Sequence, residues 1–495
     1  MSTSPALSLS TTPLAEAKVD LIIAPVFEGA LAEEGAIAAL LGELVGGARD
    51  IAAREKFTGK AGQRLALPTF GKLPAGEILL AGLGKADEAT LASFRDSVAE
   101  GVRGARRAGQ GAVAVGLPEG IDGAARAGAE GAVLGNYRFD RYLSKKDDDT
   151  DVGGVEVVSF HGEGEADAIA LGAAIAEATN HARDLVNEPA GAMHPESLAA
   201  FAQELAEAHG LEFEVHQGEA LEALRFGMMT AVGRASQYAP RMIVLKYRPE
   251  GKDTGPGVAF VGKGVTFDAG GYDLKPAAAM LDMKMDMGGS AAALSAMRAV
   301  AAIKPPFAVT AYVGAVENLV SGDAYKPGDI LTSRKGTTVE VNNTDAEGRL
   351  VIGDVLTYAS EQGHEAIIDL ATLTGACMVA LGPYTVGGFS NDDTLAEAVL
   401  GASKEAGEDI WRMPLNHALK EQLKSDIADM RNTGERFGGA ITAALFLEHF
   451  VGETPWMHLD IAGPAMIGRD RGADRKGATG VGVRTLAQWI LNRAS

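Results

Sequence analysis

The sequence lacks several features that would point to particular classes of protein. A single cysteine, Cys377, occurs in 495 residues, which excludes an intrachain disulfide and a zinc site built from several cysteines. Its apolar surroundings favour a buried structural thiol over a nucleophile. No window holds about 18 consecutive apolar residues, so we expect no membrane span. Residues 1–13 lack the basic start and apolar core of a signal peptide, and we expect a cytoplasmic protein.

Basic charge is also scarce. The chain has 45 Lys and Arg residues against 66 Asp and Glu, a net charge of −21. This balance argues against a general affinity for nucleic acid or anionic membranes, which both need basic surfaces, and it suits metal ions as partners. Hydrophobic residues make up 46% and charged residues 22%, which is typical of a globular protein. The length allows two or more domains with a large core.

Several common catalytic and binding motifs are missing. Residues 82–85, Gly-Leu-Gly-Lys, lack the third glycine and the helix placement of a dinucleotide fingerprint, and His364-Glu365 is not followed by a second zinc-binding histidine. There is no Gly-x-Ser-x-Gly elbow and no phosphate-binding P-loop. The acidic run at 147–151 is contiguous rather than alternating, which indicates an exposed loop and not a calcium site.

Short apolar runs alternate with helical patterns, which predicts an α/β protein of two domains. In the first third we predict a parallel, doubly wound sheet, with strands at 19–24, 78–82, 112–115 and 155–160 and helices at 34–45 and 89–107. A long helical run at 165–186 ends before Pro189 and Gly191. We therefore predict a smaller N-terminal α/β domain (1–164), a linking helix (165–186) and a larger α/β domain (187–495).

The second domain repeats the alternation over about 300 residues, a size that one large domain reaches. Its predicted strands are 211–215, 241–247, 258–261, 307–313, 366–370 and 456–461. Its predicted helices are 194–208, 291–303 and 483–491. His458 lies in the last of these strands, where a single histidine is more often a hydrogen-bonded core residue than a ligand.

Residues 342–350, Asn-Asn-Thr-Asp-Ala-Glu-Gly-Arg-Leu, are the first candidate site. Asp345, Glu347 and Arg349 alternate after the predicted strand 338–341, and residues two apart in an extended segment point the same way. We therefore expect the three side chains to converge. Two carboxylates at close range repel unless a proton or cation lies between them, so the pattern indicates a metal ion. The alternative is a solvated turn with scattered charges.

A glycine-rich crossover after the strand at 258–261 supplies the second candidate set. It carries Lys263, Asp268, Lys275 and Asp286, and ligands in open α/β sheets bind beyond the C-terminal ends of the strands. The flanking residues 277–287 include several apolar side chains that indicate burial, and buried charges need partners or metals. Surface ion pairing is the alternative.

The combined set is rich in carboxylates and poor in histidine. Such ligands suit Mg²⁺ or Mn²⁺, and Zn²⁺ also accepts carboxylates. Four carboxylates are enough to hold two ions, which together lower the pKa of a shared water and stabilise an oxyanion. The residues alone therefore indicate a dinuclear hydrolase, and they leave open whether it cleaves peptides or phosphate esters.

Beyond these residues, motifs in the second domain resemble those of the leucyl (cytosol) aminopeptidase family. The octapeptide Asn-Thr-Asp-Ala-Glu-Gly-Arg-Leu at 343–350 is similar to that family's signature. Further similar segments lie at 182–189, 261–268, 286–289, 369–376, 458–463 and 477–480. The resemblance implies a metal-dependent exopeptidase with a mixed central sheet in its catalytic domain, acting on peptides as a homohexamer.

The resemblance also implies a role for each site residue. One ion would be held by Lys263 as a neutral amine, Asp268, Asp286 and Glu347, and the other by Asp268, Asp345 and Glu347. Lys275 would polarise the scissile carbonyl, and Arg349 would hold a bicarbonate ion that acts as general base. The implied ions are Mn²⁺ or Zn²⁺, with Mg²⁺ and Co²⁺ as alternatives.

The pocket for the first side chain of the substrate would be lined by small or apolar residues, namely Met283, Thr372, Gly375 and Ala462. Such a pocket suits leucine-like residues. Two positions depart from the family pattern: Ala465 stands where some relatives have methionine, and Tyr272-Asp273 replaces small or apolar residues. A catalytically silent, DNA-associated regulator is the remaining alternative, and the charge of −21 argues against it.

Overall fold

The computed structural model of the chain describes residues 4–32, 40–42, 47–144, 153–250 and 255–494. The acidic run at 147–151 and most of the predicted helix at 34–45 lie outside these residues. The chain forms two compact units. The first comprises residues 1–180, 405–407 and 469–476, and the second comprises 181–404, 408–468 and 477–495. Helix α5 (Ala166–Asn187) carries the chain from the first unit into the second. The predicted domain limits remain predictions.

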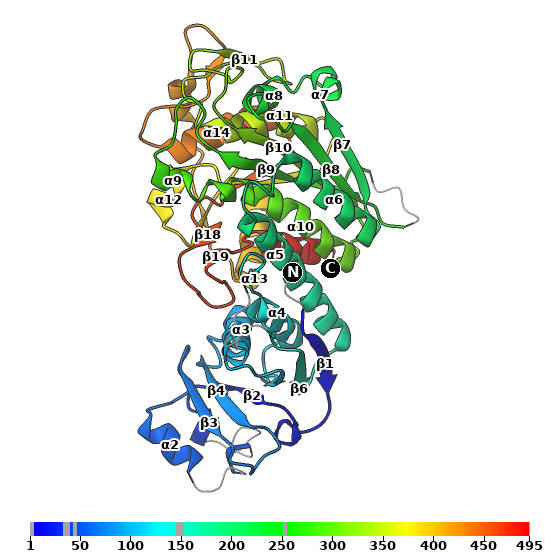
Figure 1. The fold of residues 1–495 in the computed structure, drawn as a ribbon, viewed down its shortest axis with the longest axis vertical. Helices are drawn as coiled ribbons and strands as arrows, with labels where there is room; N and C mark the ends of the chain where they lie inside the picture. The colour runs from blue at the N-terminus through cyan, green and yellow to red at the C-terminus, as the bar shows by residue number, and fades with distance from the viewer. Residues whose placement is uncertain (1–3, 33–39, 43–46, 145–152, 251–254, 495) are drawn as a thin grey trace. The chain divides into compact units, whose positions relative to one another are not determined.

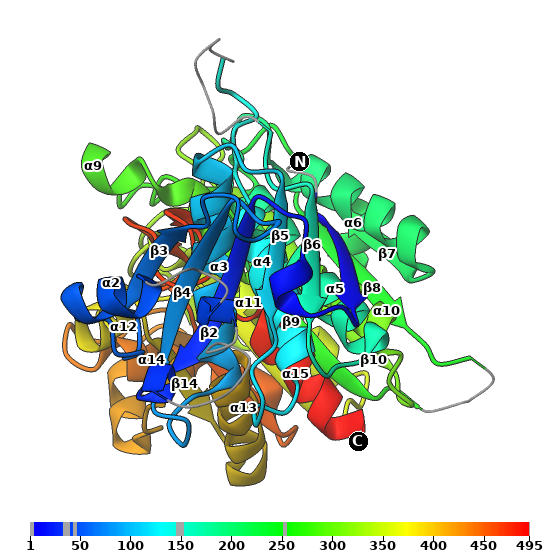
Figure 2. The ribbon, with the colours of Figure 1, turned by 90° about the horizontal axis from the view of Figure 1, so that it is seen from below.

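The first unit is built on a six-stranded sheet in the order β1-β6-β5-β2-β4-β3, whose strands appear in blue and cyan in Figure 2. The strands are β1 (Ala6–Ser10), β2 (Leu21–Phe27), β3 (Arg64–Pro68), β4 (Glu77–Gly84), β5 (Ala112–Gly116) and β6 (Val157–His161). All neighbouring strands are parallel except β3, which pairs antiparallel with β4 at the edge. The parallel sheet is as predicted, apart from this edge strand.

Alternation along β2 explains how this sheet is covered on both faces. Leu21 and Ile23 pack with residues of α3 (Leu91–Arg107) and α4 (Ala124–Asn136). Ile22 and Ala24 pack into a separate cluster that includes residues of α2 (Ala48–Arg54). Side chains of successive strand residues point to opposite faces, so an apolar strand of this kind requires a layer on each side.

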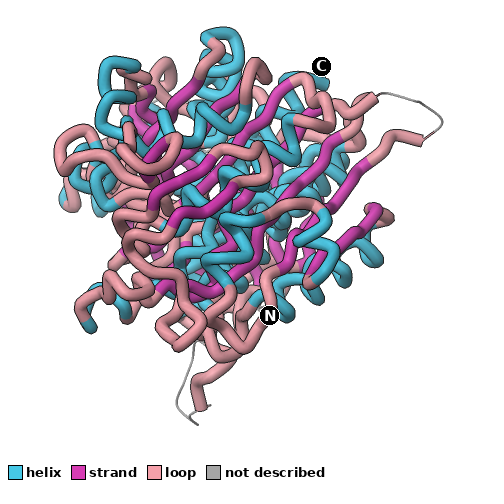
Figure 3. Tube along the Cα trace, turned by 90° about the horizontal axis from the view of Figure 1, so that it is seen from above, coloured by secondary structure: helices cyan, strands magenta, loops and turns pink. Residues whose placement is uncertain are grey.

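The second unit contains an eight-stranded mixed sheet in the order β15-β14-β17-β13-β9-β10-β8-β7, seen as neighbouring strand segments in Figures 1 and 3. The strands are β7 (Glu212–Gln217), β8 (Arg241–Tyr247), β9 (Val258–Asp268), β10 (Val309–Asn318), β13 (Ala366–Ala371), β14 (Val386–Ser390), β15 (Ile410–Arg412) and β17 (Trp456–Asp460). The four central strands, from β17 to β10, are parallel, and both flanks include antiparallel pairs. The predicted mixed sheet is confirmed.

The central strand β9 is buried on both faces. On one face Phe260 contacts the ring of Trp489 in α15 (Val483–Ala494), next to α10 (Gly288–Ile303). On the other face Ala259 and Val261 join a core cluster that contains residues of α8 (Gly227–Gly233), α11 (Glu347–Ser360) and α14 (Gly439–Val451). Remaining helices include α6 (Pro195–His209), α7 (Glu219–Ala223) and α13 (Asp393–Ala406). None of the described helices combines the length and apolarity of a membrane crossing.

The structure corrects the predicted position of the crossover. Strand β9 does not end at residue 261 but continues to Asp268, so Lys263 and Asp268 lie on the strand itself. Pairing with β10 extends along its whole length, from Val258 opposite Val309 to Asp268 opposite Asn318. The glycines at 262 and 264 suggested a loop, but the neighbouring strand supplies the hydrogen bonds that keep this segment extended.

Helix α5 also contacts α10, the helix that follows the candidate site, through a histidine that we expect to control acid stability. The ring Nε2 of His181 lies 2.9 Å from Nη1 of Arg298. Because arginine only donates, His181 must be neutral to accept this bond. Burial and the charge of Arg298 lower the pKa of His181 to about 4.

A histidine whose pKa is lower in the folded than in the unfolded protein takes up protons preferentially on unfolding. Its contribution to stability is present above about pH 6.5 and is lost as the pH falls toward 4. Between pH 7 and pH 5 we expect a loss of about 2 kcal/mol in the free energy of unfolding. The His181→Gln variant keeps an acceptor for Arg298 without titrating, so its thermal midpoint should fall less over this range. Equal shifts in both proteins would contradict the assignment.

Candidate metal centre

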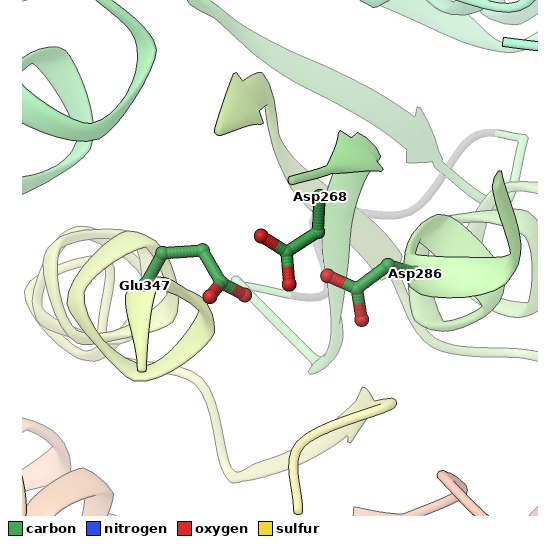
Figure 4. A group of neighbouring side chains, drawn as sticks. All are labelled: Asp268, Asp286 and Glu347. Carbon is green, nitrogen blue, oxygen red and sulfur yellow. The ribbon is translucent and has the colours of Figure 1, made fainter. Parts of the chain in front are cut away.

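Three carboxylates from separate elements meet at the C-terminal end of β9 (Figure 4). Asp268 ends β9, Asp286 lies in the 3₁₀ helix η3 (Met283–Met287) that leads into α10, and Glu347 is the first residue of α11. One oxygen from each carboxylate lies within 4.8 Å of the others, and all three residues are buried. Buried carboxylates at this distance repel strongly unless cations lie between them.

Lys263 supplies one of the cations. Its Nζ lies 2.7 Å from Oδ1 of Asp286 and 2.8 Å from Oε1 of Glu347, and it donates to the carbonyl of Thr372 at 3.0 Å. Gly348 makes this approach possible: a Cβ at that position would lie 2.7 Å from Nζ of Lys263. The lysine therefore reaches the cluster past the first turn of α11.

Lys275 supplies the second cation and brings Asp345 to the site. Its Nζ lies 2.8 Å from Oδ2 of Asp268 and 2.5 Å from Oδ1 of Asp345. The side chain of Asp345 is 34% exposed, whereas that of Glu347 is 2% exposed. Asp345 therefore lies at the open side of the cluster. Four carboxylates face two ammonium groups, which leaves an excess of negative charge.

The protonation equilibria reflect this excess. Burial disfavours the ammonium of Lys263, but the charges of Asp286 and Glu347 outweigh burial and raise its pKa. Burial and the charge of Glu347 raise the pKa of Asp268 to about 6, although Lys275 opposes the shift. Burial also raises the pKa of Asp286. The pKa of Glu347 is instead lowered, because the charges of Lys263 and Lys275 outweigh the effect of burial. Asp268 and Asp286 are therefore the carboxylates whose negative charge the neighbouring cations do not fully balance.

Two oxygens of the cluster are suited to bind a metal ion. Among the described residues, Oδ2 of Asp286 and Oε2 of Glu347 are buried and accept no hydrogen bond. Buried polar atoms without a partner are uncommon in folded proteins, and free carboxylate oxygens are preferred ligands of hard divalent ions. The residues present therefore fit a divalent metal ion.

The predicted carboxylates Asp345 and Glu347 do come close to the other site residues, but they do not lie on an extended segment as their alternation suggested. The strand before them, β12 (Thr338–Glu340), belongs to a small sheet with β11 (Ile330–Thr332) and β16 (Met430–Arg431). Asp345 lies in a turn, and Glu347 begins α11. The expected extended geometry is wrong. A carboxylate in the first turn of a helix is favoured by the helix dipole and by free backbone N–H groups.

Arg349 lies in the same first turn but does not form an ion pair with the carboxylate cluster. Its Nη1 donates to the carbonyl of Asn432 at 2.8 Å, and its buried Nε has no hydrogen-bond partner among the described residues. Burial lowers the pKa of Arg349 to about 10, while the charges of Glu347 and Asp460 oppose the shift. The guanidinium thus has one buried N–H group, at Nε, that donates neither to a carboxylate of the described residues nor to solvent.

Sequence reasoning missed the polar residues that hold these carboxylates in place. Nδ2 of Asn318 donates to Oδ1 of Asp268 at 2.8 Å and to the carbonyl of Thr344 at 3.0 Å. The hydroxyl of Tyr325 donates to the same carbonyl at 2.7 Å. Oδ2 of Asp273 accepts from the backbone N–H of Thr344 at 2.7 Å. One signal was available, since Asn318 is a polar residue at the end of an apolar strand.

The predicted pocket residues lie on segments next to the cluster. Met283 begins η3, and Thr372 follows β13 and donates from Oγ1 to Oδ1 of Asp286 at 2.7 Å. Gly375 begins α12 (Gly375–Leu381), and Ala462 follows the neighbouring strand β17. Ala465 and Thr372 both border Gly288 at the start of α10. The assignment of these residues to one pocket remains a prediction.

Two predicted core residues are confirmed. His458 is buried, and its Nδ1 lies 2.7 Å from Oδ1 of Asp369 on the neighbouring strand. Cys377 is buried as well, and burial raises the pKa of its thiol to about 12. Because thiolates and not thiols are nucleophiles, Cys377 is a structural residue.

Family models match most of the chain. The catalytic-domain model of the cytosol aminopeptidase family matches residues 180–487, and its N-terminal-domain model matches residues 23–146. The chain belongs to the cytosol aminopeptidase family.

Individual relatives agree with this membership. A probable cytosol aminopeptidase of Aquifex aeolicus is 43% identical over 90% of this chain and 91% of its own length. One from Cyanothece is 42% identical over 97% and 99%. Among solved structures, a mutant of tomato leucine aminopeptidase superposes with a TM-score of 0.90 at 36% identity, covering 99% of this chain and 98% of its own. The bottromycin maturation enzyme BotP in complex with Mn superposes at 0.85, with 38% identity and coverage of 96% and 100%.

Family membership decides between the reactions that the residues alone left open. As a member of this family, the protein is a metal-dependent hydrolase that acts on the N-termini of peptides, and not a phosphoesterase or a silent binding protein. The N-terminal-domain model extends this membership to the first unit, whose sequence carries no comparable motif.

Proposed function

We propose that this aminopeptidase works with two divalent ions held by Lys263, Asp268, Asp286, Asp345 and Glu347. The buried carboxylate cluster, with free oxygens on Asp286 and Glu347, is the observation that carries the proposal. Lys263 would hold one ion together with Asp268, Asp286 and Glu347, as a neutral amine that has lost its proton because the positive charge of the ion lowers its pKa. Asp268, Asp345 and Glu347 would hold the other, so that Asp268 and Glu347 are shared.

A bound pair of ions would supply a water of lowered pKa and a polarised peptide carbonyl. The chain itself would contribute the group that stabilises the negative charge on the carbonyl oxygen. Lys275 is suited to this role because its ammonium is held between Asp268 and Asp345 and its side chain is 14% exposed. A fixed cation at the point where charge develops lowers the barrier without reorganisation.

Arg349 would position a small anion that accepts a proton during the reaction, and bicarbonate has the required shape and charge. Two observations support this proposal. Nε of the buried guanidinium has no hydrogen-bond partner among the described residues, and Nη1 is held in place by the carbonyl of Asn432. A planar guanidinium binds planar oxyanions through paired hydrogen bonds. The anion would take up the proton that the attacking water loses.

We further propose that the pocket for the first side chain includes Met283, Thr372, Gly375 and Ala462 and prefers leucine-like residues. Apolar pockets distinguish similar side chains by only about 1–3 kcal/mol, so we expect a preference and not strict selection. Ala465, with its short side chain beside Thr372 and Gly288, would leave the pocket wide.

The ions we propose are Mn²⁺ or Zn²⁺, with Mg²⁺ or Co²⁺ as alternatives, because the ligands are mainly carboxylate oxygens. We also propose a cytoplasmic homohexamer, supported by the resemblance of the sequence motifs to the family. Light scattering would test the assembly, since a hexamer has six times the 51.1 kDa mass of the chain.

Removal of the metal tests the proposed function directly. We expect EDTA followed by dialysis to abolish hydrolysis of leucine p-nitroanilide, and added Mn²⁺ or Zn²⁺ to restore it. Phenyl phosphate should not be hydrolysed under any of these conditions. A folded protein that stays inactive on the anilide with every metal would refute the proposal.

A further inference from the structure

Asn432 contacts the loop that carries the site residues of α11, although it lies about ninety residues further along the chain. It follows β16, the strand that pairs with β12 just before the loop begins. Its backbone N–H donates to the carbonyl of Glu340 at 3.0 Å and so extends this pairing by one residue. Asn432 is fully buried, with 0% of its surface exposed.

The side chain of Asn432 makes four hydrogen bonds to the backbone of the loop. Oδ1 accepts from the N–H groups of Asn342 at 2.9 Å and Asn343 at 3.4 Å. Nδ2 donates to the carbonyls of Asn343 at 2.7 Å and Ala346 at 3.5 Å. A carboxamide has two acceptor and two donor positions, and all of them are used here on one loop.

The backbone of Asn432 fixes the other end of the same segment. Its carbonyl accepts from Nη1 of Arg349 at 2.8 Å. A single buried residue thus contacts the stretch from Asn342 to Arg349 on both sides of Asp345 and Glu347. The loop has no regular secondary structure of its own between β12 and α11. At Thr344 its backbone is also held by Asn318, Tyr325 and Asp273, and Asn432 holds the residues on either side of Thr344.

We propose that Asn432 is a positioning residue for the metal centre, which it serves by holding Asp345 and Glu347 in register with Asp268 and Asp286. This inference rests on the proposed function. Asp345 and Glu347 repel each other and Asp268 when no cation intervenes, and a loop free to relax would move them apart. The carboxamide of Asn432 opposes this movement, because it holds the backbone at residues 342, 343 and 346, which lie before Asp345 and between Asp345 and Glu347.

The chemistry of the loop requires an amide at this position. The Asn432→Asp variant has the same shape and keeps the acceptor for the two N–H groups. It loses the donor to the carbonyls of Asn343 and Ala346, and it places a negative charge beside them, close to an already acidic cluster. The Asn432→Ala variant loses all four bonds.

Asn391 provides a matched control. Its Oδ1 accepts from the N–H of Trp456 at 2.8 Å, and its Nδ2 donates to the carbonyl of Thr454 at 3.0 Å. Asn391 follows the C-terminal end of β14. Because β14 runs antiparallel to β17, this end lies beside the N-terminal ends of the central strands, opposite the ends at which the metal centre lies. The Asn391→Ala variant should lose a smaller clamp, of two side-chain hydrogen bonds to the backbone at an exposed position, without affecting the ions.

The test is equilibrium binding of Mn²⁺ to the full-length protein without substrate, followed by measurement of kcat and KM on leucine p-nitroanilide. We expect both Asn432 variants to bind at least one of the two ions about tenfold more weakly or worse, as is usual when a residue that supports a metal ligand is lost. At limiting Mn²⁺ kcat should fall by a similar factor, KM should change little, and excess Mn²⁺ should restore part of the turnover. The Asn391→Ala variant should match the wild type.

Three results would overturn the inference. One is wild-type affinity for both ions in folded Asn432 variants. Another is an equal loss of ions in the Asn391→Ala variant, which would indicate general loosening. The third is failure of both Asn432 variants to fold while the Asn391→Ala variant folds, which would assign Asn432 to stability alone. A wild type that binds none of Mn²⁺, Zn²⁺, Mg²⁺ and Co²⁺ would instead refute the proposed function.

Discussion

The Asp268→Asn variant is expected to lose both metal ions together and to lose turnover on the order of 10³-fold, because a bound metal ion supplies several kcal/mol of transition-state stabilisation. Asp268 lies at the centre of the cluster, with Oδ1 held by the N–H of Gly270 and by Asn318 and Oδ2 paired with Lys275. The asparagine side chain is neutral and offers only one oxygen, so a ligand shared by two ions would fail for both.

Metal analysis after dialysis measures this effect, together with hydrolysis of leucine p-nitroanilide. The Asp369→Asn variant is a suitable control, since Asp369 is a buried carboxylate of the same sheet that pairs with His458 and Trp456 and not with the cluster. It should lose stability but keep its ions. Retention of two tightly bound ions in the Asp268→Asn variant would show that this carboxylate does not bridge them.

The Lys275→Ala variant is expected to keep both ions and to lose about 10²–10³-fold in kcat, the usual effect of removing one group that stabilises an oxyanion. Removing the ammonium leaves Asp268 and Asp345 without their cation. The repulsion between these carboxylates in the metal-free protein then increases, so divalent ions should bind as tightly as before or more tightly. A loss of turnover without a loss of metal would separate the role of Lys275 from that of the ligands.

Lys246 offers the corresponding control, because its Nζ is paired with Glu214 at 2.6 Å on strands β8 and β7, away from the centre. The Lys246→Ala variant should keep wild-type kcat and metal content. If the Lys275→Ala variant instead lost its ions, Lys275 would have to be reassigned as a residue that assembles the metal site.

The identities of the charged site residues were predictable from local patterns. Carboxylates and lysines within otherwise apolar segments indicate burial, and buried charges of one sign require cations. This argument identifies Lys263, Asp268 and Asp286, which are buried. The expected burial of the apolar flank at 277–281 is wrong, because no residue of α9 (Ala277–Met280) is buried and Leu281 is 79% exposed. The same apolar periodicity predicted the parallel sheet of the first unit and the core strands β8, β13 and β17 of the second, because burial on both faces imposes nearly continuous apolar runs.

The geometry of the site was less predictable. Alternation suggested an extended segment through Glu347, yet this residue begins α11, where the dipole and free N–H groups of the helix favour a carboxylate. Glycines suggested a crossover after residue 261, yet pairing with β10 keeps β9 extended as far as Asp268. For β9 a long-range interaction, its pairing with β10, prevailed over the local preference. For Glu347 one local preference, that of a carboxylate for the first turn of a helix, prevailed over another.

The sequence by itself determined the two-domain α/β class and, through its motifs, the family, and it predicted the carboxylates that meet in the buried cluster. Only the tertiary structure decided how those residues meet and what holds them. Asn432 has no distinctive local pattern, and the position of Asn318 at the end of an apolar strand does not reveal its partner. Both residues act on backbone groups that are remote in the chain, those of the loop at 342–346. Apolar periodicity is a local property that a sequence displays directly, whereas a hydrogen bond between distant segments exists only once the fold has brought them together.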